Sequence, residues 1–227
     1  MSGSVQLILF DLDGTLLDTA PDLGAALNAQ RSHHGMPPLA QSLIRPVVSH
    51  GSPALLNLGF GITPGDARYP GLRRQLLDIY AARLTDETHC FPGIAAVLDR
   101  LEREGRRWGV VTNKPGFLTT PLLAAFGLER RAACVVSGDT TARRKPHPDQ
   151  LLHACELCKA KTAETVYVGD AQRDIQAARA AGMHALVALY GYIGAEENPH
   201  DWDADGLLAQ PADLLTWLQQ YALPASQ

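Results

Sequence analysis

The sequence predicts an α/β fold in which a doubly wound parallel sheet carries an inserted helical cap domain. Two observations support this. From about residue 91 onward, short apolar runs alternate with segments of helical periodicity, a pattern typical of parallel strands joined by crossover helices. A first apolar run ends at Phe10, and the residues between it and the later strands have helical periodicity only. We therefore expect an α/β core of residues 1–16 and 92–227 and a helical cap of residues 17–91.

Composition narrows the class of protein. The chain has 227 residues, of which 46% are hydrophobic and 19% are charged, as is usual for a globular protein with an apolar core. Its net charge of −4 is spread along the sequence, so neither a nucleic-acid partner nor an anionic membrane is expected. No apolar run in the sequence approaches the length of a membrane span. The first residues lack the basic start that is typical of a signal peptide. We expect a cytoplasmic protein, monomeric or homodimeric.

The stretch ILFDLDGTLLDT, residues 8–19, is the most informative part of the sequence. An apolar run of this length that stops at a turn predicts a strand buried on both faces. Asp11 and Asp13 follow it directly, and Gly14 permits a sharp turn. Carboxylates this close repel each other unless a cation lies between them. One aspartate here would be interpreted as a helix cap, whereas D-x-D-G-T after a buried strand indicates a ligand site.

The expected cap contains helices separated by turns. Thr19 and Asp22 have the spacing of a capping box, and Pro21 suits a first helical turn. Further turns are predicted at residues 35–38, 51–53 and 59–64, and a last helix at residues 72–84, with no strand in the region. After the cap we expect strands at 108–112, 133–137, 165–169 and 184–189. We expect one helix that starts at Pro92 and is closed by Gly105, a second that follows the strand 108–112 and runs through Leu123 and Phe126, and others at 148–158, 171–181 and 212–221.

Cys155 and Cys158 form a C-x-x-C pair that could indicate a redox or zinc site. A redox pair usually lies at a helix N-terminus, but this one falls late in a predicted helix. The sequence also has no second pair to complete four zinc ligands. We therefore expect two buried thiols facing the core.

Polar residues follow three later apolar segments. Thr112 and Asn113 end a strand, where they could bind an anion or cap a helix. Lys145 is in the sequence KPHP, and the prolines would restrict the backbone that carries it. Asp170 ends another strand, and Asp174 lies one helical turn further on, on the same face. Taken singly, each residue also has an ordinary structural explanation.

Together, these stretches resemble the four motifs of haloacid dehalogenase (HAD) superfamily phosphatases, in the expected order. The resemblance implies a HAD-like, Rossmannoid core with an inserted cap. It also implies that Asp11 is the nucleophile, that Asp13 is the acid and base, and that Lys145 neutralises charge on the phosphoryl group. Thr112, with Asn113 beside it, would bind phosphate. Ala171 departs from the Ser or Asp that many members carry at that position.

The acidic residues also predict a cofactor. Several carboxylates with one lysine leave excess negative charge, which a hard divalent cation with oxygen ligands relieves. We infer Mg²⁺ held by Asp11 and Asp170, with Asp174 in support. The resemblance adds the backbone carbonyl of Asp13 as a ligand.

Substrate choice is expected to depend on the cap, which would close as a lid. Arg45, His50 and Ser52 are candidates for contact with a substrate carboxylate or hydroxyl, Arg45 foremost, and each also suits an ordinary surface or capping role. Residues 190–205, which include Tyr190, Tyr192, Asn198 and Trp202, resemble phosphoglycolate phosphatases and, more closely, N-acetylmuramic acid 6-phosphate phosphatases. The first expectation is hydrolysis of a small phosphate ester, 2-phosphoglycolate. The alternatives are the muramic acid sugar phosphate, phosphoryl transfer of the β-phosphoglucomutase type, a signalling receiver module and a non-catalytic relative.

Overall fold

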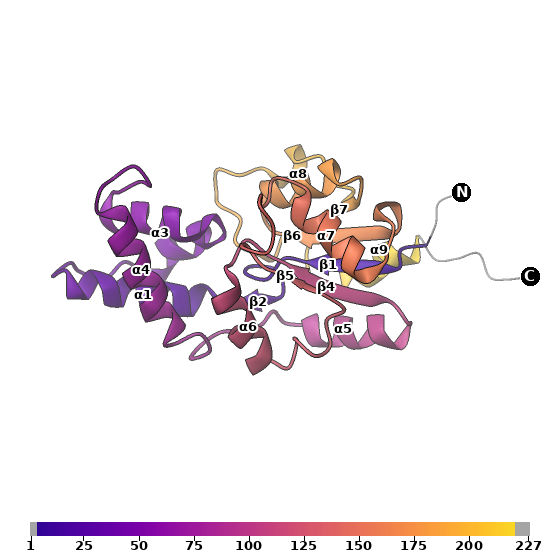
Figure 1. Ribbon diagram of the computed structural model, residues 1–227, viewed down its shortest axis with the longest axis horizontal. Helices are drawn as coiled ribbons and strands as arrows, with labels where there is room; N and C mark the ends of the chain where they lie inside the picture. The colour runs from indigo at the N-terminus through magenta and orange to yellow at the C-terminus, as the bar shows by residue number, and fades with distance from the viewer. Residues whose placement is uncertain (1–3, 221–227) are drawn as a thin grey trace, which may run out of the picture.

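A parallel sheet forms the centre of the computed structural model, which describes residues 4–220. Its six strands have the order β5-β4-β1-β6-β7-β8 (Figure 1). All neighbouring strands pair in parallel, which confirms the predicted fold class. The strands are β1 (Leu7–Phe10), β4 (Arg107–Val111), β5 (Val135–Val136), β6 (Thr165–Gly169), β7 (His184–Ala188) and β8 (Gly206–Leu208).

Side chains of β1 alternate between two apolar cores, one on each face of the sheet. Ile8 and Phe10 belong to the core that α5 (Ile94–Arg103), α6 (Gly116–Ala125) and α9 (Asp213–Gln219) cover. Leu7 and Leu9 belong to the core under α7 (Asp149–Cys158) and α8 (Gln172–Ala180). Both faces of β1 are therefore dry, as its unbroken apolar sequence predicts.

Several predicted boundaries need correction. The strand expected at 133–137 has only two residues, Val135–Val136. Strand β8 was not expected, because three residues at the edge of a sheet give no usable periodicity. The last helix is Asp213–Gln219, and the predicted extension to residue 221 falls outside the described residues. Among the described residues, no helix has both the length and the apolar character needed to span a bilayer.

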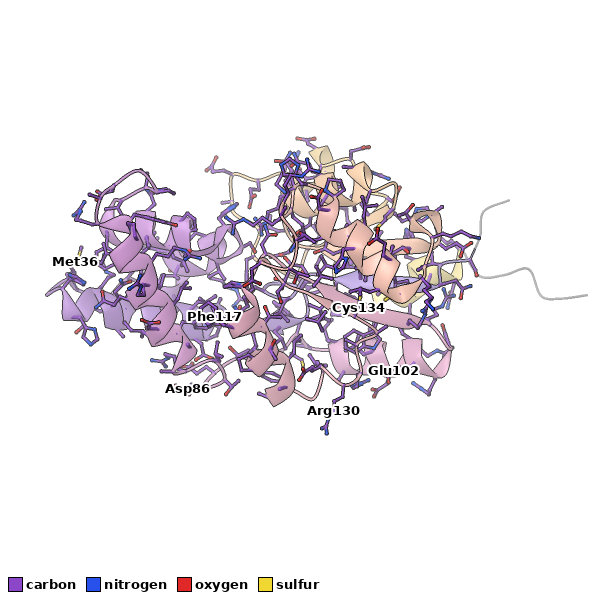
Figure 2. All side chains as sticks on the ribbon, viewed as in Figure 1. Met36, Asp86, Glu102, Phe117, Arg130 and Cys134 are labelled. Carbon is purple, nitrogen blue, oxygen red and sulfur yellow. The ribbon has the colours of Figure 1, made fainter. Side chains whose placement is uncertain are left out.

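The predicted C-x-x-C pair is buried on the core-facing side of α7. Cys155 and Cys158 are both at most 4% exposed and share their apolar core with Cys134. Cys134 is labelled in Figure 2. This confirms the expectation of buried thiols.

Four helices make up the segment between Asp18 and His89, which lies at one end of the molecule (Figure 1). They are α1 (Ala20–His33), α2 (Gln41–Ile44), α3 (Gly51–Phe60) and α4 (Tyr69–Ala81), with a 3₁₀ turn at Arg45–His50. Helix α1 packs against the other three. We call this segment the insert; its treatment as a separate cap domain, residues 17–91, stays a prediction.

Two short strands lie where the chain enters and leaves the insert. Strands β2 (Leu17–Asp18) and β3 (His89–Cys90) pair antiparallel, so the expectation that the region has no strand was wrong. Two-residue strands are too short to produce an alternating pattern in the sequence. Their pairing holds the two chain connections side by side.

The predicted capping box at the start of α1 is also wrong. The Thr19 hydroxyl donates to Asp13 instead of capping the helix. The buried Asp22 carboxylate accepts hydrogen bonds from the backbone N–H groups of Glu87 and Thr88 and from the Thr88 hydroxyl. Asp22 therefore ties the first turn of α1 to the segment that returns to the core.

Replacing Asp22 by alanine is expected to destabilise the fold by about 2–4 kcal/mol, because the substitution leaves the buried N–H and hydroxyl donors of Thr88 unsatisfied and removes the contact with the Glu87 N–H. Urea unfolding measures the change. Asp78→Ala, at an exposed position of α4, is the matched control and should stay within about 0.5 kcal/mol of wild type. Equal stability of Asp22→Ala and the control would contradict the proposed tie.

Candidate active site

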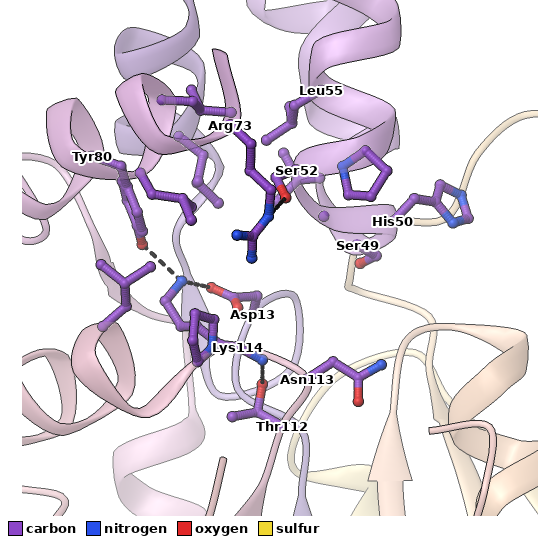
Figure 3. Close-up of a pocket in the computed structure, with 18 of the residues that line it drawn as sticks. Asp13, Ser49, His50, Ser52, Leu55, Arg73, Tyr80, Thr112, Asn113 and Lys114 are labelled. Carbon is purple, nitrogen blue, oxygen red and sulfur yellow. Dashed lines mark hydrogen bonds and ion pairs between the residues drawn. The ribbon is translucent and has the colours of Figure 1, made fainter. Parts of the chain in front are cut away.

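A cavity of about 350 Å³ lies at the carboxyl end of the sheet, between the strand tips and the insert (Figure 3). The sheet side contributes the residues that follow β1 and β4, and the insert contributes side chains from α3, α4 and the turn before α3. The polar and charged side chains that line the cavity include those of Asp11, Asp13, Ser49, His50, Ser52, Arg73, Tyr80, Thr112, Asn113, Lys114, Arg144, Lys145 and Arg173. The predicted residues Asp11, Asp13, Thr112, Asn113 and Lys145 thus line one cavity.

Asp11 follows β1 at the bottom of this cavity and is only 4% exposed. One of its oxygens, Oδ1, accepts the backbone N–H of Leu12 at 2.8 Å and lies 3.1 Å from Lys145 Nζ. Burial raises the pKa of Asp11, while the charge of Lys145 opposes that shift. The lysine is therefore the cation beside Asp11 that keeps its ionised form accessible.

Lys145 is held from several sides. Its Nζ lies 2.8 Å from Asp174 Oδ1 and donates to Val111 O and to the hydroxyl of Tyr167. Its backbone is fixed as well, because its N–H donates to Gln150 and its carbonyl accepts from Asn113. A buried ammonium group with this many partners is well oriented, which supports the functional interpretation of Lys145 over a solvated charge.

Asp11, Asp170 and Asp174 form a buried acidic group. Each contributes one carboxylate oxygen, and these oxygens lie within 4.8 Å of one another. Asp170 Oδ2 accepts from the Ser49 hydroxyl and from the backbone N–H of Tyr192, whereas its buried Oδ1 has no hydrogen-bond partner. Burial, followed by the charges of Asp174 and Asp11, raises the pKa of Asp170 to about 7. This unsatisfied oxygen among converging carboxylates fits a hard divalent cation.

The Asp13 carboxylate has a different environment. Its Oδ1 accepts from the Thr19 hydroxyl at 2.6 Å and from Lys114 Nζ at 2.8 Å. Lys114 Nζ also donates to the Tyr80 hydroxyl of α4 (Figure 3). Burial by itself lowers the pKa of Lys114, but Asp13 and Tyr80 outweigh it and raise that pKa, so the lysine stays charged. Asp13 is thus held at the cavity by an ion pair with the buried Lys114.

Lys114 is a functional candidate that the sequence analysis missed. Its position directly after Thr112 and Asn113, at the end of a buried strand, was the available signal. A lysine before proline is ordinarily solvated, and the contact with Asp13 joins residues 101 positions apart. The spacing of residues along the sequence does not predict an ion pair between positions so far apart.

Thr112 and Asn113 are located where an anion could be bound. Thr112 Oγ1 accepts the N–H of Lys114, and both residues line the cavity beside Asp13. Asn113 Nδ2 donates to the Lys145 carbonyl, while its buried Oδ1 has no partner. Their predicted contact with phosphate stays a prediction.

Arg45 is not among the residues that line the cavity. Its guanidinium binds Asp18 through two contacts of 2.9 Å and lies 4.9 Å from the ring centre of Tyr192. This placement argues against the predicted contact with substrate and instead makes Arg45 a link between the insert and β2. By contrast, His50 and Ser52, the other insert candidates, do line the cavity.

In the distinctive segment 190–205, Tyr192 has the most contacts near the site. Its hydroxyl donates to Asp18 and accepts from the backbone N–H groups of Thr19 and Ala20, while its own N–H donates to Asp170. Tyr190 and Tyr192 also pack on Phe91. The segment thus packs beside the sheet and supports Asp170.

A parallel sheet with a buried carboxylate–lysine site at its carboxyl edge is typical of a hydrolase with an α/β fold. This chain belongs to the haloacid dehalogenase-like hydrolase family, whose sequence profile matches residues 8–188.

Two relatives and one solved structure give the comparison more detail. A phosphoglycolate phosphatase of Xanthomonas campestris pv. campestris (strain 8004) is 45% identical over 92% of this chain and 94% of the relative. An N-acetylmuramic acid 6-phosphate phosphatase of Pseudomonas aeruginosa is 37% identical over 95% of this chain and 96% of its own length. The crystal structure of a predicted phosphoglycolate phosphatase from Haemophilus somnus 129PT has a TM-score of 0.83 at 27% identity, covering 93% of this chain and 97% of that one. The chain is accordingly a phosphatase.

Lys114→Met should lower kcat for an alkyl phosphate by roughly 10–100-fold, since it removes the cation that holds Asp13. The loss with p-nitrophenyl phosphate should be smaller, because that leaving group departs without protonation. Both rates are measured by phosphate release. Lys161→Met, which alters a lysine that is 80% exposed, is the matched control and should change neither rate. Equal losses on the two esters would contradict the assigned role.

Proposed function

We propose that this phosphatase hydrolyses a small phosphate monoester, first of all 2-phosphoglycolate, through an aspartyl-phosphate on Asp11. The observation that carries the proposal is the pairing of buried Asp11 with Lys145 Nζ, 3.1 Å away, at one end of the cavity. A carboxylate nucleophile with a fixed cation beside it suits attack on a phosphoryl group, whose own negative charge would otherwise repel it.

The other site residues have separate tasks in this proposal. Lys145 and Thr112 stabilise charge on the phosphoryl oxygens, with Asn113 beside them. Asp13 protonates the leaving alcohol and then takes a proton from the water that hydrolyses the intermediate. Lys114 and Thr19 keep the Asp13 carboxylate in place for both steps, which supports its assignment as the acid and base.

The acidic group would hold Mg²⁺. Asp11 and the unpartnered Oδ1 of Asp170 are the proposed carboxylate ligands, with the backbone carbonyl of Asp13 completing the protein ligands and Asp174 in support. When bound, the ion supplies positive charge to the transferring phosphoryl group. Asp174 also accepts from the N–H of Ala171 at the start of α8, which supports a positioning role for this residue.

Cavity size and charge support a small anionic substrate. A volume of about 350 Å³ is near the lower limit of ordinary ligand sites. Cationic side chains also outnumber carboxylates along its walls. The 45% identical relative favours 2-phosphoglycolate, and the 37% identical relative favours N-acetylmuramic acid 6-phosphate as the second candidate. Phosphoryl transfer of the β-phosphoglucomutase type is the third. A metabolite of this kind is consistent with the expected cytoplasmic location.

Removing divalent metal with EDTA should abolish phosphate release, and excess Mg²⁺ should restore it. Mg²⁺ should also raise the thermal unfolding midpoint, because an ion that binds only the folded state stabilises it. Asp170→Asn should reduce that thermal shift. Undiminished activity in excess EDTA, or an unfolding midpoint that does not respond to Mg²⁺, would contradict the cation site.

A substrate panel tests the function itself. Phosphate release from 2-phosphoglycolate, N-acetylmuramic acid 6-phosphate and hexose phosphates is compared as kcat/KM, and we expect 2-phosphoglycolate to give the highest value. Asp11→Asn should eliminate release from every ester while leaving the circular dichroism spectrum unchanged. Preference for another ester would replace the proposed substrate, and turnover by Asp11→Asn would exclude Asp11 as nucleophile. Isomerisation of a hexose 1-phosphate without phosphate release would favour the transferase alternative.

A further inference from the structure

Arg73 is located on α4, in the wall of the cavity that the insert provides. Its Nε donates to the Ser52 hydroxyl at 3.3 Å, and the guanidinium points into the cavity toward Lys114 and Asp13 (Figure 3). Within residues 4–220, no carboxylate lies within ion-pair distance of it. With Nε engaged by Ser52, the two terminal nitrogens remain directed at the space where a substrate would lie.

Apart from the exposed Arg144, the other lysine and arginine side chains that line the cavity already have partners on the protein. Lys145 contacts Asp11 and Asp174, and Lys114 contacts Asp13. Arg173 donates to the Ser49 carbonyl, and the acidic group raises its pKa. Arg144 is exposed beside Lys145. Arg73 is therefore the cation on the insert side that is positioned to bind a second anionic group of a substrate.

We propose that Arg73 determines specificity by binding a carboxylate on the leaving group, so that the preferred substrates are phosphate monoesters that also carry a carboxylate. The proposal rests on the proposed function, because a phosphate at Asp11 directs its leaving group across the cavity toward the insert. A guanidinium presents paired N–H donors that match the two oxygens of a carboxylate. The first turn of α3, which includes Ser52, adds partial positive charge on the same wall.

The chemistry of the two candidate substrates agrees with this proposal. 2-Phosphoglycolate has a carboxylate on its leaving group, and N-acetylmuramic acid 6-phosphate has one on its lactyl ether. Hexose phosphates without such a group offer Arg73 only hydroxyls. The two candidate substrates therefore share a carboxylate that a general sugar phosphatase would not require.

Two matched ester pairs test the assignment. 2-Phosphoglycolate is compared with 2-hydroxyethyl phosphate, and N-acetylmuramic acid 6-phosphate with N-acetylglucosamine 6-phosphate; each pair differs in the group that bears the carboxylate. Of the two esters that carry a carboxylate, the one with the higher wild-type kcat/KM is the reference. Arg73→Ala should lower kcat/KM for that ester by roughly 10–100-fold, mainly by raising KM. Its effect on the neutral partner should be below about threefold. Arg73→Lys should recover part of the loss, because it keeps the charge without the paired donors.

Arg74→Ala is the control, because Arg74 is exposed on the same helix and does not line the cavity; both kinetic constants should match wild type. Retained turnover of the neutral esters shows that Arg73→Ala is folded. Equal losses on both members of a pair, or no loss on either, would overturn the proposal. If the wild-type enzyme has a higher kcat/KM for N-acetylmuramic acid 6-phosphate than for 2-phosphoglycolate, the proposed substrate is wrong. The second pair of esters then still tests the role of Arg73. Wild-type preference for the neutral ester in both pairs overturns the Arg73 assignment.

Discussion

The site depends on one electrostatic constraint, which is that three carboxylates are buried within reach of one another. Asp11, Asp170 and Asp174 lose their hydration and also repel, and both effects raise the pKa of Asp11 and Asp170. Lys145 is the protein's own compensation, because its ammonium lies between Asp11 and Asp174. The remaining deficit of positive charge is what the proposed cation would supply.

The parallel sheet brings these residues together. Asp11 follows β1 and Asp170 follows β6, and β1 and β6 are neighbours in register. Thr112 follows β4 on the other side of β1. Side chains that follow adjacent parallel strands necessarily meet at one edge, so an apolar run followed by a polar residue contains enough information to predict this part of the site. For the same reason, the fold class and Asp11, Thr112 and Asp170 could be placed from sequence.

The rest of the site depends on contacts that no local pattern specifies. Lys114 and Arg73 were missed because each acquires its role across the boundary between the insert and the sheet, Lys114 through Asp13 and Tyr80, and Arg73 through its position in the cavity wall. The turn-rich sequence around Arg45 favours contact with substrate, yet its partner is Asp18 in β2, a strand too short to predict. The helical periodicity of the insert indicates which faces are buried, but it does not give the orientation of the insert over the sheet.

That orientation is connected directly to the acidic group. Ser49, in the turn before α3, donates to Asp170 Oδ2, and Arg173 of α8 donates back to the Ser49 carbonyl. Tyr192 donates its N–H to the same Asp170 oxygen and binds Asp18 through its hydroxyl, where Arg45 of the insert also binds. A movement of the insert away from the sheet would break the Ser49 contact and leave Asp170 with one fewer donor. The position of the insert and the hydrogen bonding of Asp170 are therefore linked, because the Ser49 donor comes from the insert and its acceptor from the end of β6.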